Sequence, residues 1–232
     1  MSSAVQPDYQ HIAAVIPAAG VGKRMQSELP KQYLQLHGKT ILEHSASVLL
    51  QLPVPLVIAL SAQDAYFSAT PLATHPAVQT VRGGVERADS VLAALQLLNS
   101  EQFPWVLVHD AARPLVQLSD IQQLIQQCLP SGHGGILASP VRDTMKRGQQ
   151  RVECTVERAD LWHALTPQLF PTALLRQALS QALAAGVAVT DEASAMEWAG
   201  QPVQLIAGRS DNIKVTQPED LALAAFYLEN RV

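Results

Sequence analysis

The amino-acid sequence predicts an α/β fold, with a mostly parallel twisted sheet flanked by helices. Short apolar segments alternate along the chain with segments whose apolar residues recur at helical spacing. The apolar segments do not alternate regularly with polar residues, which is typical of strands covered on both faces. Of the 232 residues, 48% are hydrophobic, so the chain can bury a large core without a disulfide or a metal. We therefore expect a single domain spanning 1–232.

The expected strands are short apolar segments, each followed by small or polar residues. In chain order they lie at 12–16, 56–60, 78–81, 105–108, 136–138 and 203–206. The double glycine Gly83-Gly84 ends the third strand, since glycine commonly breaks regular structure. In parallel sheets, ligands bind beyond the carboxyl ends of the strands. The loops that follow the strands are therefore where we expect a functional site.

The expected helices are segments in which apolar residues recur every three or four positions. In chain order they lie at 40–52, 87–98, 119–128, 172–185, 191–199 and 218–227. Thr40, Ser119 and Thr190 stand at three of the starts and are the expected N-terminal caps. Gly186 ends one helix and Pro218 begins the last, both at positions these residues favour.

Residues 141–160 interrupt this alternation and form the most charged stretch of the chain. Val152 and Val156 favour a strand here, and Gly148 lies near the middle. We expect a β-arm at about 139–160 that projects from the sheet. Such an arm buries little surface by itself, so contact with a second copy of the chain would stabilise it.

The composition excludes several classes of partner. The chain has 16 Lys and Arg against 20 Asp and Glu, a net charge of -4 and no long basic run, so we expect no nucleic acid and no membrane partner. No apolar run approaches the roughly 18–20 residues of a membrane span. Cys128 and Cys154 fit no zinc motif and suit a reducing compartment. With no basic and apolar leader at its start, the protein is expected to be cytoplasmic.

The loop after the first expected strand carries residues suited to binding an anion. Residues 17–25 are rich in small side chains that let backbone N–H groups approach a phosphate. Lys23, Arg24 and Lys31 add three cations, although neither a P-loop nor a GxGxxG pattern is present. A solvated turn is the alternative interpretation. The position directly after the first strand favours anion binding.

Other loops are open to two interpretations. Asp110, at a strand end, suits Mg²⁺ or a polar substrate group, and otherwise forms a turn. Ser90 can donate to a base or ribose, or can belong to an ordinary turn after the double glycine. The segments 140–146 and 190–192 can contribute to a site, or can be a solvated hairpin and a helix cap. Lys214 is flanked by apolar residues and so needs an anionic partner.

Cations and small residues at several strand ends are the groups that polyphosphate chemistry requires. In nucleotidyl transfer, an anionic phosphate attacks the α-phosphate of a nucleoside triphosphate and needs no general base. The barrier comes from bringing anions together and from charge that develops on the transferring group. Preorganised Arg and Lys side chains, with Mg²⁺, lower both contributions.

Seven segments together resemble the 2-C-methyl-D-erythritol 4-phosphate cytidylyltransferases of the non-mevalonate isoprenoid pathway, in the family's order and spacing. The segments are PAAGVGKRM with LPKQYL (17–34), GGVERADSV (83–91), VHDAARP (108–114), PVRDTMK (140–146), LTPQLF (165–170), TDEASAME (190–197) and DNIKVTQPEDL (211–221). The resemblance implies a Rossmann-like nucleotidyltransferase fold and a homodimer whose arms interlock and whose active sites are shared. It also implies transfer of CMP from CTP to methylerythritol phosphate, with Mg²⁺ or another divalent cation.

The resemblance assigns roles position by position. Arg24 and Lys31 match the catalytic pair, which stabilises the triphosphate and the transition state. The implied nucleotide-binding residues are Pro17, Ala18, Ala19, Gly20, Gly22, Lys23, Gly84, Val85, Ser90, Asp110 and Ala111. The implied residues for the polyol phosphate are Asp110, Arg113, Thr144, Arg158, Thr190 and Lys214. Thr144 and Arg158 would come from the arm of the partner subunit, and Mg²⁺ would be held mainly by the CTP phosphates, with Asp110 as the candidate protein ligand.

Two positions depart from the family pattern, and other functions stay open. Val85 stands where many relatives have aspartate, and Lys23 stands where arginine is usual. A ribitol 5-phosphate cytidylyltransferase would share the fold and most motifs. A non-catalytic nucleotide-binding regulator would lack Arg24 or Lys31, and both are present. An NAD-binding oxidoreductase would need the GxGxxG pattern.

Overall fold

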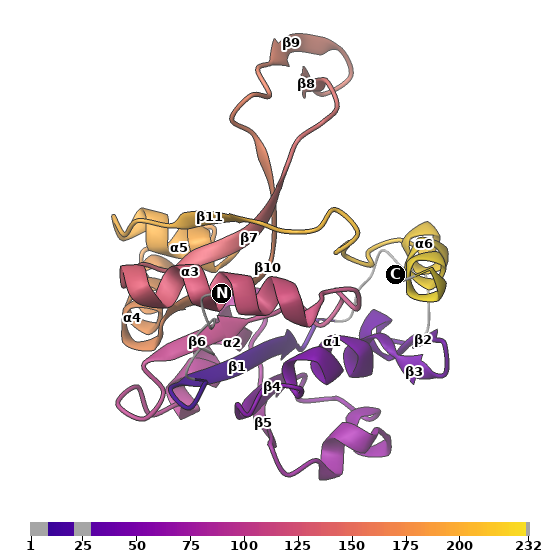
Figure 1. Ribbon diagram of the computed structural model, residues 1–232, viewed down its shortest axis with the longest axis vertical. Coiled ribbons are helices and arrows are strands. Elements are labelled where there is room, and N and C mark those ends of the chain that lie inside the picture. The colour runs from indigo at the N-terminus through magenta and orange to yellow at the C-terminus, as the bar shows by residue number, and fades with distance from the viewer. Residues whose placement is uncertain (1–8, 21–28, 231–232) are drawn as a thin grey trace, which may run out of the picture.

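The main sheet is built from strands distributed along nearly the whole chain. The computed structural model describes residues 9–20 and 29–230. Within these residues the strands of the main sheet are β1 (Ile12–Ala18), β4 (Leu56–Leu60), β5 (Val78–Arg82), β6 (Trp105–Val108), β7 (Gly135–Pro140), β10 (Trp162–Pro171) and β11 (Gln204–Ala207). Their order across the sheet is β11-β7-β10-β6-β1-β4-β5 (Figure 1). The pairs β4–β5, β1–β4, β1–β6 and β7–β11 are parallel, so the predicted mostly parallel sheet is confirmed.

Strand β10 is absent from the sequence prediction. It runs antiparallel between β6 and β7, and its residues 165–170 are buried. The polar Thr166 and Gln168 and the intervening Pro167 interrupt the apolar pattern that identifies the other strands. The pairing with β7 shifts register between Ala164 and Gln168, so Pro167 lies where the ladder is already irregular.

Helices cover both faces of the sheet. They are α1 (Ile41–Leu49), α2 (Arg87–Leu97), α3 (Leu118–Ser131), α4 (Thr172–Ala184), α5 (Glu192–Trp198) and α6 (Pro218–Glu229). Ile12, Ala14 and Ile16 of β1 share one core with α1 and α3, whereas Ala13 and Val15 share another with α2, α4 and α5 (Figure 1). Because successive side chains of β1 are buried on opposite faces, the strand is apolar throughout.

Two of the expected helix caps are displaced by one or two residues. Thr40 caps α1 as predicted, accepting from the backbone N–H of Glu43 in a capping box. The prediction for Ser119 is wrong, because α3 begins at Leu118 and Ser119 lies inside its first turn. The prediction for Thr190 is also wrong, since Asp191 caps α5 by accepting from the backbone N–H of Ser194.

The expected arm is a separate two-stranded sheet. β8 (Met145–Gly148) and β9 (Val152–Val156) pair antiparallel and project far from the main sheet on the chain between β7 and β10 (Figure 1). Most of its side chains are exposed in the single chain, and Val152 is 65% exposed. The arm therefore derives little stability from its own packing.

The last helix positions a segment that borders the site. Ala224 of α6 shares a small core with Leu36, Ile41 and Val215, next to the hairpin of β2 (Gln35–Leu36) and β3 (Lys39–Thr40). The N–H of Val215 donates to the carbonyl of Ala112 at 2.8 Å, so the segment before α6 lies against the loop after β6. In the described part of the chain, no helix is long and apolar enough to cross a membrane.

Candidate active site

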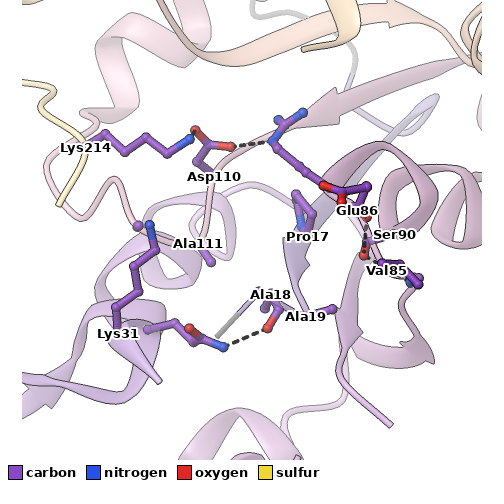
Figure 2. A pocket seen from close by; sticks show the side chains of 15 residues that line it. Pro17, Ala18, Ala19, Lys31, Val85, Glu86, Ser90, Asp110, Ala111 and Lys214 are labelled. Atoms are coloured by element: carbon purple, nitrogen blue, oxygen red, sulfur yellow. Dashed lines mark hydrogen bonds and ion pairs between the residues drawn. The ribbon is translucent and has the colours of Figure 1, made fainter. Parts of the chain in front are cut away.

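A cavity of about 300 Å³ opens at the carboxyl ends of β1, β5 and β6. Most of the residues assigned to the nucleotide by resemblance line it, together with two lysines. The predicted site residues that line it are Pro17, Ala18, Ala19, Gly20, Lys31, Gly84, Val85, Ser90, Asp110, Ala111 and Lys214. Figure 2 shows Lys31 and Lys214 on one side of this cavity and Val85 and Ser90 on the other. Gly22, Lys23 and Arg24 lie outside the described residues.

The wall after β1 combines exposed backbone with a lysine. Gln32 donates from Nε2 to the carbonyl of Ala18 at 2.8 Å and so holds the end of β1 in place. Lys31 opens the short 3-10 helix Lys31–Tyr33, and its Nζ lies 3.4 Å from the carbonyl of Val215. Gln32 is buried and was missed by sequence reasoning, where it reads as one of many scattered glutamines.

Close packing around the turn after β5 explains why glycine occupies both position 83 and position 84. A Cβ at Gly83 would lie 2.6 Å from Ala19 Cβ, and a Cβ at Gly84 would lie 2.2 Å from Asp89 Cβ. Ser90 Oγ accepts from the backbone N–H of Gly84 and donates to the carbonyl of Glu86, each at 3.2 Å, so Ser90 braces this turn. The Val85 side chain is 94% exposed at the edge of the cavity. A side chain at Gly83 would therefore clash with Ala19, just after β1, and one at Gly84 would clash with the first turn of α2.

Asp110 is the electrostatic centre of the cavity. Its Oδ1 lies 2.8 Å from Arg87 Nε, and its Oδ2 lies 2.8 Å from Lys214 Nζ. Arg113 Nε is 3.5 Å from Oδ2, and the Asp110 N–H donates to Thr166 Oγ1 at 3.0 Å. Burial alone would raise the pKa of Asp110, but the nearby cations, Arg87 foremost, hold it well below its usual range. The carboxylate is therefore ionised, and Lys214 has the anionic partner that its sequence context required.

Arg87 and Glu192 were missed as site residues. Arg87 Nη1 and Nη2 donate to the two carboxylate oxygens of Glu192, at 2.7 and 3.0 Å. Glu192 is fully buried at the start of α5, in the segment 190–192 that the sequence leaves open between a site and a helix cap. Their separation of 105 residues left no local signal that they pair.

A second cavity, of about 500 Å³, adjoins the first on the side of the arm. Arg113 and Lys214 border it, and Lys214 also borders the nucleotide cavity. Arg113 is held by Nη1 donating to the Asn212 carbonyl at 2.7 Å and Nη2 donating to the Ala164 carbonyl at 3.2 Å. The two cavities therefore meet at a lysine paired with Asp110.

Three residues assigned to the substrate line neither cavity in the single chain. Thr144 and Arg158 belong to the exposed arm, where Arg158 donates to the carbonyl of Arg142. Thr190 is exposed just before α5. One chain does not bring these residues to Asp110.

His109, next to Asp110, is fully buried. Its Nε2 lies 3.0 Å from the carbonyl of Arg113, and its Nδ1 lies 2.9 Å from Thr166 Oγ1. Because a carbonyl can only accept, we assign the proton to Nε2 and let Nδ1 accept from the Thr166 hydroxyl. Burial lowers the pKa of His109 to about 4, so the ring is neutral at pH 7.

The low pKa of buried His109 predicts that the free energy of unfolding falls as the pH decreases from 7 to 5. Folded His109 stays neutral until about pH 4, whereas the unfolded chain takes up this proton near pH 6.5, so acid favours the unfolded state in between. Between pH 7 and pH 5 the loss should be on the order of 2 kcal/mol. Urea unfolding at both pH values would measure it. His109→Gln should remove this part of the pH dependence, and equal dependence in both proteins would contradict the assignment.

The fold and the cavities together define a class of protein. A ligand site at the carboxyl edge of a mostly parallel sheet, bordered by exposed backbone, glycines and cations, is that of a nucleotide-using transferase.

Comparisons with known proteins identify the family. The family model for 2-C-methyl-D-erythritol 4-phosphate cytidylyltransferase matches residues 12–230. The chain is 59% identical over 223 residues to the enzyme of that name from Vibrio vulnificus strain CMCP6, covering 94% of each chain. It is 55% identical over 227 residues to the one from Cronobacter sakazakii, covering 96% of this chain and 95% of the relative.

Solved structures of cytidylyltransferases with the same fold support this family assignment. The crystal structure of the cytidylyltransferase from Thermus thermophilus superposes with a TM-score of 0.80 at 30% identity, covering 94% of this chain and 98% of that one. The structure from Francisella tularensis gives a TM-score of 0.78 at 33% identity, covering 93% and 99%. The chain belongs to the 2-C-methyl-D-erythritol 4-phosphate cytidylyltransferase family and is a nucleotidyltransferase.

Proposed function

We propose that the protein transfers CMP from CTP to 2-C-methyl-D-erythritol 4-phosphate, a step in the synthesis of isoprenoid precursors. The products are 4-diphosphocytidyl-2-C-methyl-D-erythritol and pyrophosphate. The observation that carries the proposal is the meeting of two cavities at Lys214, one walled by small residues and the other bordered by Arg113. A triphosphate in the first and a polyol phosphate in the second would have their reacting phosphates side by side.

In this mechanism a phosphate oxygen of the polyol phosphate forms a bond to the α-phosphorus of CTP, and the bond from that phosphorus to the β-phosphate oxygen breaks. The attacking oxygen is already anionic, so no residue has to remove a proton. Lys31 and Arg24 act by balancing negative charge on the triphosphate and on the transferring group. Lys214 and Arg113 reduce the repulsion between the two substrates.

In the proposed reaction a divalent cation would be held mainly by the phosphates of the nucleotide. The described residues contain no group of three or more His, Cys, Asp or Glu side chains that could hold a metal by themselves. Mg²⁺ commonly binds through one or two carboxylates together with substrate phosphates. Asp110 is the candidate carboxylate, and in the single chain both of its oxygens are paired with cations. When bound, Mg²⁺ or another divalent cation would neutralise charge on the phosphates of CTP.

The arm supports a homodimer with shared active sites. Met145, Val152 and Trp162, on or beside the arm, are 37%, 65% and 40% exposed in the single chain, and a second copy would cover such apolar side chains. Thr144 and Arg158 would then enter the partner's second cavity. In this proposal the chain acts as one cytoplasmic nucleotidyltransferase domain of residues 1–232, with the arm at about 139–160 and with neither nucleic acid nor membrane as a partner.

Arg158→Ala should raise KM for the polyol phosphate more than KM for CTP, since the proposal assigns Arg158 to the polyol phosphate. Losing one charge-assisted hydrogen bond, of about 1.5–3 kcal/mol, corresponds to roughly 10- to 100-fold in that KM. Steady-state kinetics with each substrate varied would measure it, and Arg151→Ala, on the same exposed arm, is the matched control.

Mixed dimers test whether the site is shared. Arg158→Ala combined with an inactive Arg24 variant should regain activity, because one of the two sites in a heterodimer would then carry both native residues. No regained activity in demonstrated heterodimers would contradict the shared site.

One assay tests the reaction. The protein is incubated with CTP, Mg²⁺ and either methylerythritol phosphate or ribitol 5-phosphate, and pyrophosphate release is followed. We expect release with methylerythritol phosphate. Faster release with ribitol 5-phosphate would support the alternative cytidylyltransferase, and CTP binding without release from either would support a non-catalytic regulator.

A further inference from the structure

One guanidinium links the starts of two helices to the centre of the site. Arg87, the first residue of α2, uses Nη1 and Nη2 to hold both oxygens of Glu192, the first residue of α5. The same side chain uses Nε to hold Asp110 Oδ1 at 2.8 Å. We name this set the Glu192–Arg87–Asp110 chain. Because the guanidinium is planar and rigid, fixing one edge on Glu192 fixes the direction in which Nε points.

The Glu192 end of this chain is itself anchored. Glu192 is fully buried. The next N–H, of Ala193, donates to Gln168 Oε1 at 2.9 Å, and Gln168 Nε2 donates to Asp191 Oδ2 at 2.9 Å. Gln168 belongs to β10, so the start of α5 is tied to the sheet. Glu192 is therefore held in place by contacts that connect the start of α5 to the main sheet.

The two oxygens of Asp110 have partners that differ in how easily they can leave. Arg87 cannot turn away from Oδ1 without leaving the buried Glu192 carboxylate unpaired, which is costly. Lys214, the nearer partner of Oδ2, is a point charge on a flexible stem, and its side chain is 37% exposed, whereas Arg113 Nε lies 3.5 Å from this oxygen. Lys214 also borders both cavities. Oδ2 is thus the oxygen that can exchange partners when substrates enter.

We propose that Glu192, acting through Arg87, is a positioning residue that fixes Asp110 Oδ1, so that Oδ2 exchanges Lys214 for a hydroxyl group of a bound substrate. The inference rests on the proposed function, because it takes the incoming ligands to be a nucleotide and a polyol phosphate. Both carry hydroxyl groups that can donate to a carboxylate, while their phosphates attract the released Lys214. Glu192 itself touches no substrate in this arrangement.

Glu192→Gln is the direct test. Glutamine keeps the shape of the side chain but loses the charge and the two-oxygen grip on Arg87. We expect kcat/KM for both substrates to fall by about 10- to 100-fold, because small displacements of a positioned group can cost up to about 10²-fold in rate. Glu197→Gln, on the same helix but exposed, is the matched control and should leave kcat/KM unchanged.

A double-mutant cycle separates positioning from general structural support. If Glu192 acts through Asp110, adding Glu192→Gln to an Asp110→Asn protein should lower kcat/KM by no more than about twofold. If Glu192 only supports the fold, Glu192→Gln should lower kcat/KM by the same factor in the wild-type and Asp110→Asn proteins. That result would overturn the inference. Thermal unfolding of each protein verifies that the folded state is being compared.

A second variant keeps the test decisive if Glu192→Gln does not fold. Arg87→Lys preserves the positive charge but cannot bridge both carboxylates, so it should give the same non-additive result with Asp110→Asn. An unaffected Arg87→Lys enzyme would also overturn the inference. The proposed function fails separately, and only if the wild-type protein releases no pyrophosphate from CTP and methylerythritol phosphate.

Discussion

Replacing Lys31 with alanine should lower kcat by about 10²–10³, the usual consequence of removing one preorganised charge-stabilising group. Lys31 lies at the start of a short 3-10 helix on the wall of the nucleotide cavity, and its Nζ is 3.4 Å from the Val215 carbonyl. That contact is long for a hydrogen bond. Lys31 lines the cavity, and in the proposed mechanism its ammonium balances charge on the triphosphate, so its loss should be felt in the transition state.

The measurement is kcat with both substrates saturating, together with thermal unfolding. Lys39→Ala is the matched control, since Lys39 is exposed on the hairpin just after this segment and borders neither cavity. Its kcat should match that of the wild type. Unchanged kcat in Lys31→Ala would remove Lys31 from the mechanism, whereas a large loss of unfolding temperature would show that it supports the fold instead.

Asp110→Ala should both abolish most activity and destabilise the protein, by about 3 kcal/mol in the free energy of unfolding. Asp110 is buried and neutralises cations from three separate segments, among them the buried Arg113. Removing one member of a buried ion network leaves the others uncompensated, which costs more than the network contributes in the first place. The remaining Arg87–Glu192 pair and the partial exposure of Lys214 keep the loss near the lower end of the usual range.

Urea unfolding at pH 7 measures this loss. Asp160→Ala, at an exposed position on the arm, should change the free energy of unfolding by less than about 0.5 kcal/mol. If Asp110→Ala were as stable as this control, the cations around Asp110 would be adequately hydrated, and the buried network would not be a stabilising feature.

Much of the fold could be predicted from the sequence because its signals are local. Strands such as β1 and β4 are buried on both faces and so are apolar throughout, and helices such as α1 carry both a cap and an apolar face. β10 could not be predicted in this way. Its Thr166 and Gln168 are polar because they hold other parts of the site, Thr166 contacting Asp110 and Gln168 contacting Asp191. These polar side chains interrupt the apolar pattern that would otherwise have identified β10 as a strand.

The residues of the candidate site also differ in whether the local sequence singles them out. Asp110 and Lys214 could be singled out because each has an unusual local context, a carboxylate at a strand end and a lysine among apolar residues. The role of Glu192 could not, because an acidic residue in the first turn of a helix already has a sufficient local explanation. What distinguishes Glu192 is its burial against Arg87, a contact made only when α2 and α5 pack on the same face of the sheet.

The ion pair between Asp110 and Lys214 has a consequence for which anions the protein can retain. A simple anion, such as inorganic phosphate, meets at Lys214 an ammonium whose charge Asp110 already balances, and it offers that carboxylate little in return. A phosphorylated polyol can do both, pairing its phosphate with the lysine while its hydroxyls donate to Asp110. If the protein binds a polyol phosphate as proposed, the resident carboxylate would compete with abundant small anions for Lys214 and would favour ligands that carry both a phosphate and hydroxyl groups.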